Sequence, residues 1–281
     1  MYRRRKGDNM ADRKEQLKEI TDKLEQGIKD VFESGKYADY LQAMSKFHRY
    51  SINNCLLIAM QCPAATMVAG YRKWQDEFGR QVKKGETAIR ILAPMTRKRK
   101  TVVQDEDGNE REEEVKYTTY RAVPVFDISQ TEGKELPNIC RRLDGDDGAE
   151  LIDRVIAAAP VPVQYKDIEG SANGYYSRTE GLIAVRKDLS PMQTLKTLIH
   201  EVAHATLHCE DGVQADANRG AKEVQAESVA YTVCNYFGID TSEYSFGYVA
   251  AWSEGKELAE LRESLEVIRT TAGAIIDSIA A

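Results

Sequence analysis

The sequence lacks the features that build covalent or membrane-spanning frameworks. Its five cysteines are odd in number and form no CxxC pair, which predicts reduced thiols rather than a disulfide frame or a zinc ribbon. No apolar run approaches the roughly eighteen residues that a membrane span needs. The basic start, residues 1–16, is followed by no apolar segment, so it is not a secretory signal. These absences predict a cytoplasmic protein with no membrane partner.

Charge is divided unevenly along the 281 residues. Residues 1–100 carry 22 Lys+Arg and 12 Asp+Glu, a net charge of +10; residues 101–281 carry 17 and 33, a net charge of −16; the sum is −6. A basic part joined to an acidic part suggests that the first meets a polyanion. Ordinary surface charge with a lysine-rich first helix explains the division as well.

The chain has four histidines, and three of them fall within residues 197–208, TLIHEVAHATLH. Apolar positions recur there at helical spacing, and a serine–proline pair is a typical start for such a helix. On a helix His200 and His204 lie one turn apart on one face, where two neutral imidazoles can bind Zn²⁺. Glu201 lies beside that face and can take a proton from metal-bound water, as in the HExxH motif of zinc peptidases.

A catalytic zinc site needs a third protein ligand and keeps one position open for water. Glu223 and Glu227 lie four apart on the next predicted helix, 219–236, so one can bind the metal while the other supports a histidine. His208, one turn beyond His204, is a candidate ligand or supporting residue, although the helix dipole also accounts for a histidine at that end.

The residues before the metal helix predict a hairpin whose edge can pair with an extended peptide. Its two segments are GYYSRTE, 174–180, and GLIAVRKDL, 181–189. Tyr175 and Tyr176 are candidates to donate a hydrogen bond to an oxyanion, although such tyrosines are more often simply packed.

Residues 50–94 mix aromatic rings with amides and cations. Such a mixture binds single-stranded nucleic acid, because bases stack on the rings while cations follow the phosphates. The candidate contacts are Tyr50, Asn53, Asn54, Tyr71, Arg72, Lys73, Trp74, Arg80, Lys83, Lys84 and Arg90. A small α/β core that buries Tyr71 and Trp74 fits the same residues, and composition alone favours that core.

Six runs of the sequence resemble one family. They are YSINNCLLIAMQCPAATMVAGYRKW, VKKGETAIRILAP and VFDISQTEGKELP in the first half, and HEVAHATLH, EVQAESVAYTVCNYFGID and GYVAAWSEGKELAELRESLEVIRTTAGAI in the second. Over roughly residues 37–281 they resemble the ArdC antirestriction proteins and their LtrC-like relatives. The second half is also similar to the ImmA/IrrE metallopeptidases.

The resemblance implies an α+β protein. A small α/β N-terminal domain that binds single-stranded DNA would be joined to a mainly helical, zincin-like metallopeptidase domain of the gluzincin type with a small sheet. The predicted limits are 1–127 for the first domain, with a helix at 11–35 and a charged hairpin at 95–116, then 128–149 for a linker and 150–281 for the second domain.

Two details follow from the family comparison and from charge. The order of residues resembles that of thermolysin-like gluzincins, which favours Glu223 as metal ligand and Glu227 as its supporting residue. The predicted hairpin, with its turn at 107–109, sets RKRK (97–100) against an acidic run, so the charges can neutralise each other across the strands. RKRK is therefore not expected to bind DNA.

Two functions from different classes fit this sequence. The first is a single-stranded-DNA-binding zinc metalloendopeptidase of a mobile genetic element, with Zn²⁺, Mn²⁺ or another divalent metal on His200, His204 and Glu223, and with Glu201 as general base. The second is a protein that coats single strands during conjugation and protects them from restriction, with a structural or little-used metal site. A weaker alternative is an ImmA-like protease that cleaves a repressor. The sequence names no peptide substrate.

Overall fold

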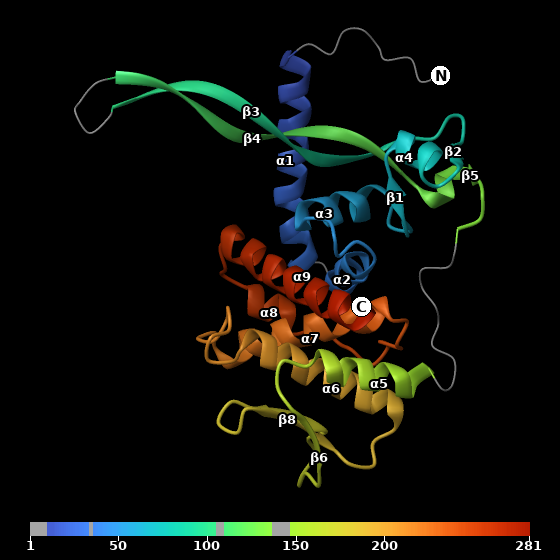
Figure 1. The fold of residues 1–281 in the computed structure, drawn as a ribbon, viewed down its shortest axis with the longest axis vertical. Helices are drawn as coiled ribbons and strands as arrows, with labels where there is room; N and C mark the ends of the chain where they lie inside the picture. Colours follow the sequence, from blue (N-terminus) through green and yellow to red (C-terminus); the bar gives the residue numbers. More distant parts are fainter. Residues whose placement is uncertain (1–9, 34–35, 105–109, 137–146) are drawn as a thin grey trace.

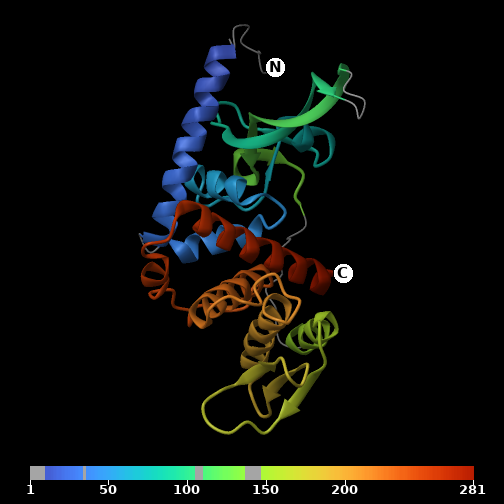
Figure 2. The same cartoon turned by 90° about the vertical axis from the view of Figure 1, so that its left-hand side faces the viewer.

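Two three-stranded sheets lie at opposite ends of the molecule, and helices fill the space between them (Figure 1). The computed structural model describes residues 10–33, 36–104, 110–136 and 147–281. A view turned by 90° shows the same succession of sheet, helices and sheet (Figure 2). The structure is a mixed helix and sheet fold, which confirms the predicted class.

The described elements follow the predicted order closely. The helices are α1 (Met10–Glu33), α2 (Tyr37–Lys46), α3 (Ile52–Gln61), α4 (Tyr71–Asp76), α5 (Asp147–Ala158), α6 (Pro191–Leu207), α7 (Arg219–Tyr236), α8 (Val249–Ser253) and α9 (Leu258–Ala280). The strands are β1 (Val68–Ala69), β2 (Arg80–Val82), β3 (Ile89–Gln104), β4 (Glu110–Asp127), β5 (Thr131–Gly133), β6 (Val163–Lys166), β7 (Gly174–Ser177) and β8 (Leu182–Arg186). In the part of the chain that is described, no helix combines the length and apolar character that crossing a bilayer requires.

Three of the helices begin after a residue whose side chain caps the first turn. Ser51 accepts a hydrogen bond from a backbone N–H of the first turn of α3, and Ser190 does the same for α6, where Pro191 occupies the first helical position. Asn218 caps α7 in this way. Each cap satisfies an N–H group that has no partner within the helix, so the sequence sets these boundaries locally.

The strands arrange in three sheets. The first has the order β1-β4-β3, the second pairs β2 with β5, and the third has the order β6-β8-β7. Within the third sheet β6 runs parallel to β8 and β7 runs antiparallel to it. The predicted hairpin before α6 is therefore present, and β7 forms one edge of its sheet.

The hairpin β3–β4 is longer than the sequence predicts. Its antiparallel pairing continues without a break from Ile89 opposite Val125 to Gln104 opposite Glu110. The charged segments expected between the strands are thus mostly part of them, and the hairpin extends well away from the helices (Figure 1). The predicted turn at 107–109 lies outside the described residues.

The predicted linker needs a correction. Residues 128–136 contain a short 3-10 helix, Ile128–Gln130, and β5, which pairs with β2 of the first half. This segment therefore belongs to the N-terminal part rather than to a linker. Residues 137–146 lie outside the described residues, and the remaining domain limits stay a prediction.

Helix α7 is buried along most of its length and connects the two halves. It packs against α6, α9 and α2. In the buried contact with α2, the hydroxyl groups of Tyr37 and Ser228 are 2.8 Å apart. One hydrophobic core runs from Leu24 on α1 to Ile279 on α9, so it crosses the boundary between the predicted domains.

Asp127 joins the end of β4 to the chain before β1. Its buried carboxylate accepts hydrogen bonds from the backbone N–H groups of Thr66 and Met67, and from both the backbone and the hydroxyl of Ser129. Burial alone would raise the pKa of Asp127, but these hydrogen bonds hold it below the ordinary value of 3.8.

We expect Asp127→Ala to lower the free energy of unfolding by about 2 kcal/mol at neutral pH, because partly buried N–H and O–H donors lose a charged acceptor. Since the pKa is lowered in the folded state, this contribution is present above the ordinary carboxyl pKa and is lost as the pH falls through the lowered value. Urea unfolding at about pH 7 and about pH 3 measures both effects. The exposed Asp167→Ala is the control, and an equal stability loss in both variants would contradict the role of Asp127.

Candidate metal centre

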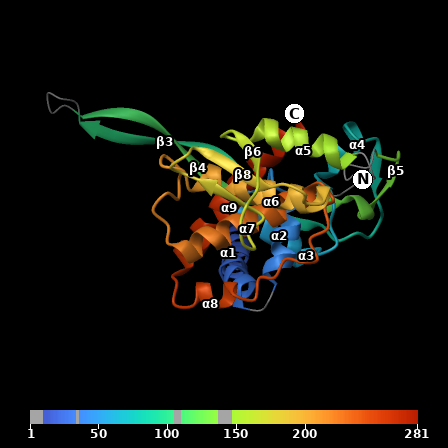
Figure 3. The same cartoon turned by 90° about the horizontal axis from the view of Figure 1, so that it is seen from below.

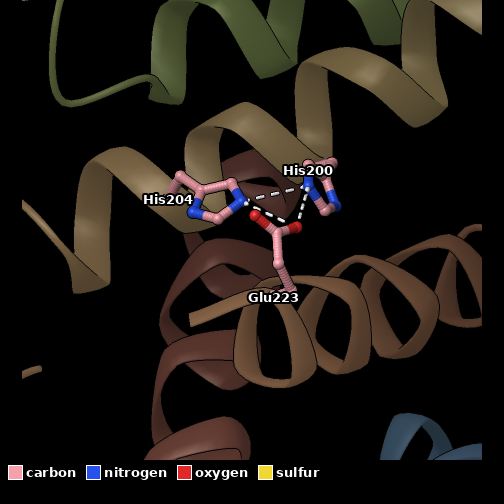
Figure 4. A group of neighbouring side chains, drawn as sticks. All are labelled: His200, His204 and Glu223. Carbon is pink, nitrogen blue, oxygen red and sulfur yellow. Dashed lines mark hydrogen bonds and ion pairs between the residues drawn. The ribbon is translucent and has the colours of Figure 1, made fainter. Parts of the chain in front are cut away.

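The side chains of His200, His204 and Glu223 converge on one point (Figure 4). The two histidines project from adjacent turns of α6, and the glutamate reaches them from near the start of α7. Their possible ligand atoms all lie within 4.8 Å of one another. The structure thus brings together the three residues that the sequence predicts as metal ligands.

The spacing and chemistry of these donors fit a divalent cation. The two Nε2 atoms are 3.1 Å apart, and Glu223 Oε2 lies 3.8 Å from His200 Nε2 and 3.7 Å from His204 Nε2. Two atoms bound tetrahedrally to Zn²⁺ would be roughly 3.3 Å apart. Burial lowers the pKa of His200 to about 4, so its imidazole is neutral at pH 7. Glu223, whose side chain is 51% exposed, supplies the carboxylate.

Glu201 lies beside this cluster and is almost fully buried, with 7% of its surface exposed. Burial raises the pKa of Glu201 to about 7, although His204 and a backbone hydrogen bond from Tyr176 oppose the rise. A carboxyl group with a pKa near neutrality can both accept and release a proton. Glu201 therefore lies next to the cluster with a pKa at which a carboxyl group can exchange protons near neutral pH.

Strand β7 packs tightly on α6 next to Glu201. A Cβ atom on Gly174 would lie 2.6 Å from Thr197 Cγ2, 2.9 Å from the Ala184 carbonyl oxygen and 3.4 Å from Glu201 Cγ. Only glycine permits this approach without a shift of the strand or the helix. The close contact removes water from one side of Glu201.

The two candidate tyrosines of β7 face opposite ways. Side chains alternate along a strand, so Tyr176 shares the face of Gly174 that meets α6, and Tyr175 lies on the opposite face. Tyr176 packs against the hydrophobic core, whereas Tyr175 is exposed. Strand alternation thus places Tyr175 on the face away from α6, and the roles of Tyr175 and Tyr176 stay predictions.

A buried hydrogen-bonded chain leads away from His204. His204 Nδ1 and His208 Nδ1 are 3.0 Å apart, and His208 Nε2 lies 3.1 Å from Gln225 Oε1. Since an amide oxygen only accepts, His208 carries its proton on Nε2 and accepts at Nδ1. His204 then carries its proton on Nδ1, and its Nε2 lone pair faces the cluster. Gln225 is held in turn by a 3.2 Å bond from its Nε2 to Gln214 Oε1.

Glu227 lies one turn beyond Glu223 but contacts a different partner. It accepts a hydrogen bond from the hydroxyl of Tyr248, and burial raises its pKa. Within the described residues, the supporting contact to a metal-site histidine comes from His208 rather than from Glu227. The sequence patterns did not point to Gln225 or Tyr248. A single amide side chain among the apolar positions of a predicted helix is the sequence signal that could have identified Gln225.

Most of the predicted DNA contacts in the first half have partners inside the protein. Trp74 is fully buried and donates a hydrogen bond to the carbonyl oxygen of Phe126, so the prediction that its indole stacks on a base is wrong. Asn54 bonds both backbone groups of Leu92 on β3. The side chains that are buried, partly buried or bonded to nearby backbone are Tyr50, Asn53, Asn54, Tyr71, Trp74, Arg80 and Lys83.

The other four predicted contacts are exposed cations. They are Arg72, Lys73, Lys84 and Arg90. Lys73 forms a 3.5 Å ion pair with Glu77 on the same helix. These positions remain open to a ligand, so their role in DNA binding stays a prediction.

Two segments of the chain match known protein families. Residues 157–268 match the IrrE N-terminal-like domain, which belongs to a peptidase family. Residues 11–126 match the N-terminal domain of anti-restriction factor ArdC. The chain is thus similar to ArdC antirestriction proteins in its first part and to IrrE-like proteins in its second part.

Known proteins are similar to this chain in sequence or in structure. An uncharacterized protein of Bacillus anthracis is 28% identical over 305 residues, which cover 95% of this chain and 51% of that protein. This chain thus spans about half the length of that relative. The metal-free crystal structure of antirestriction protein ArdC from plasmid R388 superposes with a TM-score of 0.50 at 20% identity, over 82% of this chain and 85% of that one. The Mn(II)-bound structure of that protein gives 0.49 at 21% identity, over 82% and 84%.

We expect Gly174→Ala to push β7 away from α6, because the added methyl group would overlap Thr197 and the backbone of Ala184. The free energy of unfolding should fall by about 1–3 kcal/mol, which urea unfolding measures. Gly247→Ala is the matched control, since its Cβ would meet nothing closer than 4.0 Å. A Gly174→Ala protein as stable as the control would show that the contact is not restrictive.

Proposed function

We propose that this chain is a single-stranded-DNA-binding metallopeptidase of antirestriction type, carried by a mobile genetic element. The peptidase part rests on one observation, the convergence of His200, His204 and Glu223 beside the buried Glu201. The match of residues 11–126 to the ArdC N-terminal domain supports the DNA-binding part.

In this proposal His200, His204 and Glu223 hold one divalent cation, Zn²⁺ or Mn²⁺. When bound, the cation supplies a Lewis acid that polarises a carbonyl group and lowers the pKa of water. The Glu201 carboxylate accepts the proton of the attacking water and delivers it to the nitrogen of the leaving amine. Burial raises the pKa of Glu201, which makes its carboxylate a stronger base for this proton.

The edge position of β7 supports a peptide as the substrate. β7 pairs with β8 on one side only, and it lies on α6 next to Glu201. An extended peptide could add to this edge through backbone hydrogen bonds. Such a strand would carry its peptide bonds past the cluster without requiring a particular side-chain sequence.

A second function is favoured by the exposed cations of the first half, Arg72, Lys84 and Arg90 among them. The protein would coat single strands and protect them from restriction, and the metal would stabilise the fold. Loss of hydrolysis without loss of protection would distinguish this function from the first.

Glu201→Gln is the variant that tests the peptidase proposal. We expect it to bind Zn²⁺ or Mn²⁺ in a 1:1 ratio like the wild type, because the ligands are intact, while hydrolysis of casein falls at least about 100-fold. His200→Ala, which removes a ligand, is the control that loses the metal. Metal-loaded wild type that cleaves no faster than Glu201→Gln would refute the peptidase. Protection of transferred DNA from restriction, measured in both, then decides whether proteolysis serves that role.

The chain from His204 through His208 to Gln225 predicts a positioning role for His208. His208→Phe should weaken Zn²⁺ binding about 10–100-fold by calorimetry, because the Nδ1–H of His204 loses its acceptor. Gln225→Glu keeps an acceptor for His208 and should bind Zn²⁺ with close to wild-type affinity. Thermal unfolding of the metal-free proteins checks that the variants fold. Unchanged affinity in His208→Phe would remove the positioning role.

A further inference from the structure

The hairpin β3–β4 has two faces of different composition. Its pairing register sets Arg97 opposite Tyr117, Arg99 opposite Val115, and Ala93 opposite Arg121. Because side chains alternate along a strand and directly paired residues share a face, all of these residues lie on one face of the hairpin. We call Arg97, Arg99, Tyr117 and Arg121 the arginine face.

The opposite face carries Lys98, Lys100 and Lys116, and ion pairs neutralise the first two. Lys98 Nζ lies 3.0 Å from Glu114, and Lys100 Nζ lies 2.7 Å from Glu112. These lysines and glutamates alternate with the arginines along the same strands. The prediction that the charges of this segment cancel across the strands therefore holds for this face.

The arginine face has no such compensation. Arg97, Arg99 and Arg121 are exposed, and in the described part of the chain none of them forms an ion pair with an acidic side chain. Glu113 is an acidic residue on the same face, where it is exposed opposite Thr101. Three guanidinium groups against one carboxylate leave this face positive.

An aromatic ring lies within the positive surface. The guanidinium of Arg99 lies over the ring of Tyr117, 5.8 Å from its centroid, and 39% of Tyr117 is exposed. At the base of the hairpin the same face carries Ile89 and Ile91, which are buried in the core. The arginines and the tyrosine begin where the hairpin leaves the body, and the view from below shows it extending past the helices (Figure 3).

We propose that the arginine face is a contact surface for single-stranded nucleic acid, in addition to the cations of residues 50–94. The proposal rests on the proposed DNA binding. Guanidinium groups bind phosphates through paired hydrogen bonds, and an exposed ring offers a stacking partner to a base. Arg97 and Arg99 are two residues apart, or roughly 6.8 Å along the strand, so they can reach successive phosphates of an extended strand.

The partner is a single strand rather than an acidic peptide because the face combines its charges with an available ring. A carboxylate-rich peptide would need only the guanidinium groups, so Tyr117 would not affect its binding. A base needs the ring as well, because stacking supplies much of the affinity for single strands. The ring therefore separates the two partners experimentally.

The test compares two triple variants of the full chain that change the net charge equally. One is Arg97→Gln/Arg99→Gln/Arg121→Gln, and the matched control is Lys98→Gln/Lys100→Gln/Lys116→Gln on the opposite face. Fluorescence anisotropy with labelled oligo-dT, over a series of salt concentrations, measures affinity. The arginine variant should bind at least about tenfold more weakly, with a salt slope reduced by about 2, since each lost phosphate contact removes roughly 0.7. The lysine variant should bind within a few-fold of the wild type, because Lys98 and Lys100 are already paired with glutamates.

Tyr117→Ala completes the test. It should weaken oligo-dT binding about tenfold while leaving the salt slope unchanged, because stacking releases no counterions. Equal weakening in the two triple variants, or no effect of Tyr117→Ala, would overturn the arginine face as a nucleic-acid surface. Equal loss of poly-glutamate and oligo-dT binding in the arginine variant, with no effect of Tyr117→Ala on either, would point to an acidic peptide. Wild-type protein that binds no oligo-dT would refute the proposed DNA binding itself, and the arginine face with it.

Discussion

The packing of α7 against α6 is the contact on which the candidate metal centre depends. His200 and His204 share one helix, so local geometry sets their separation, but Glu223 reaches them only because α7 lies alongside. The position of α7 is fixed in turn by α9 and by α2, where Tyr37 meets Ser228 in a buried contact. The N-terminal half therefore helps to hold the metal ligands in place, although it contributes none of them.

Burial shifts the pKa values of side chains at this centre as well as stabilising the fold. Loss of water lowers the pKa of His200 and raises that of Glu201, so at neutral pH the ligand is neutral and the adjacent carboxyl can exchange a proton. The contact of β7 at Gly174 produces part of this burial. The hydrogen bonds through His208 and Gln225 direct the lone pair of the second histidine to the same place.

The hairpin shows why charge has to be counted by face rather than by segment. Basic and acidic runs that face each other in a ladder cancel only where their side chains point to the same side. Lys98 and Lys100 meet that condition, whereas Arg97 and Arg99, one residue removed on the same strand, point the other way. A segment that looks neutral in the sequence can therefore carry one positive surface and one neutralised surface.

Helices and motifs that depend on neighbouring residues could be predicted from the sequence alone. Helical spacing placed His200, Glu201 and His204 together, and caps at Ser51 and Ser190 marked two helix starts. Tertiary structure decided which distant groups meet. Trp74 is buried and therefore cannot stack on DNA. Tyr175 lies on the face of β7 opposite to the one that meets α6. With α7 packed as it is, His208 and Gln225 support His204, whereas Glu227 contacts Tyr248. The physical reason is that residue spacing fixes direction along one helix or strand, whereas the distance between two elements follows from the packing of the whole core.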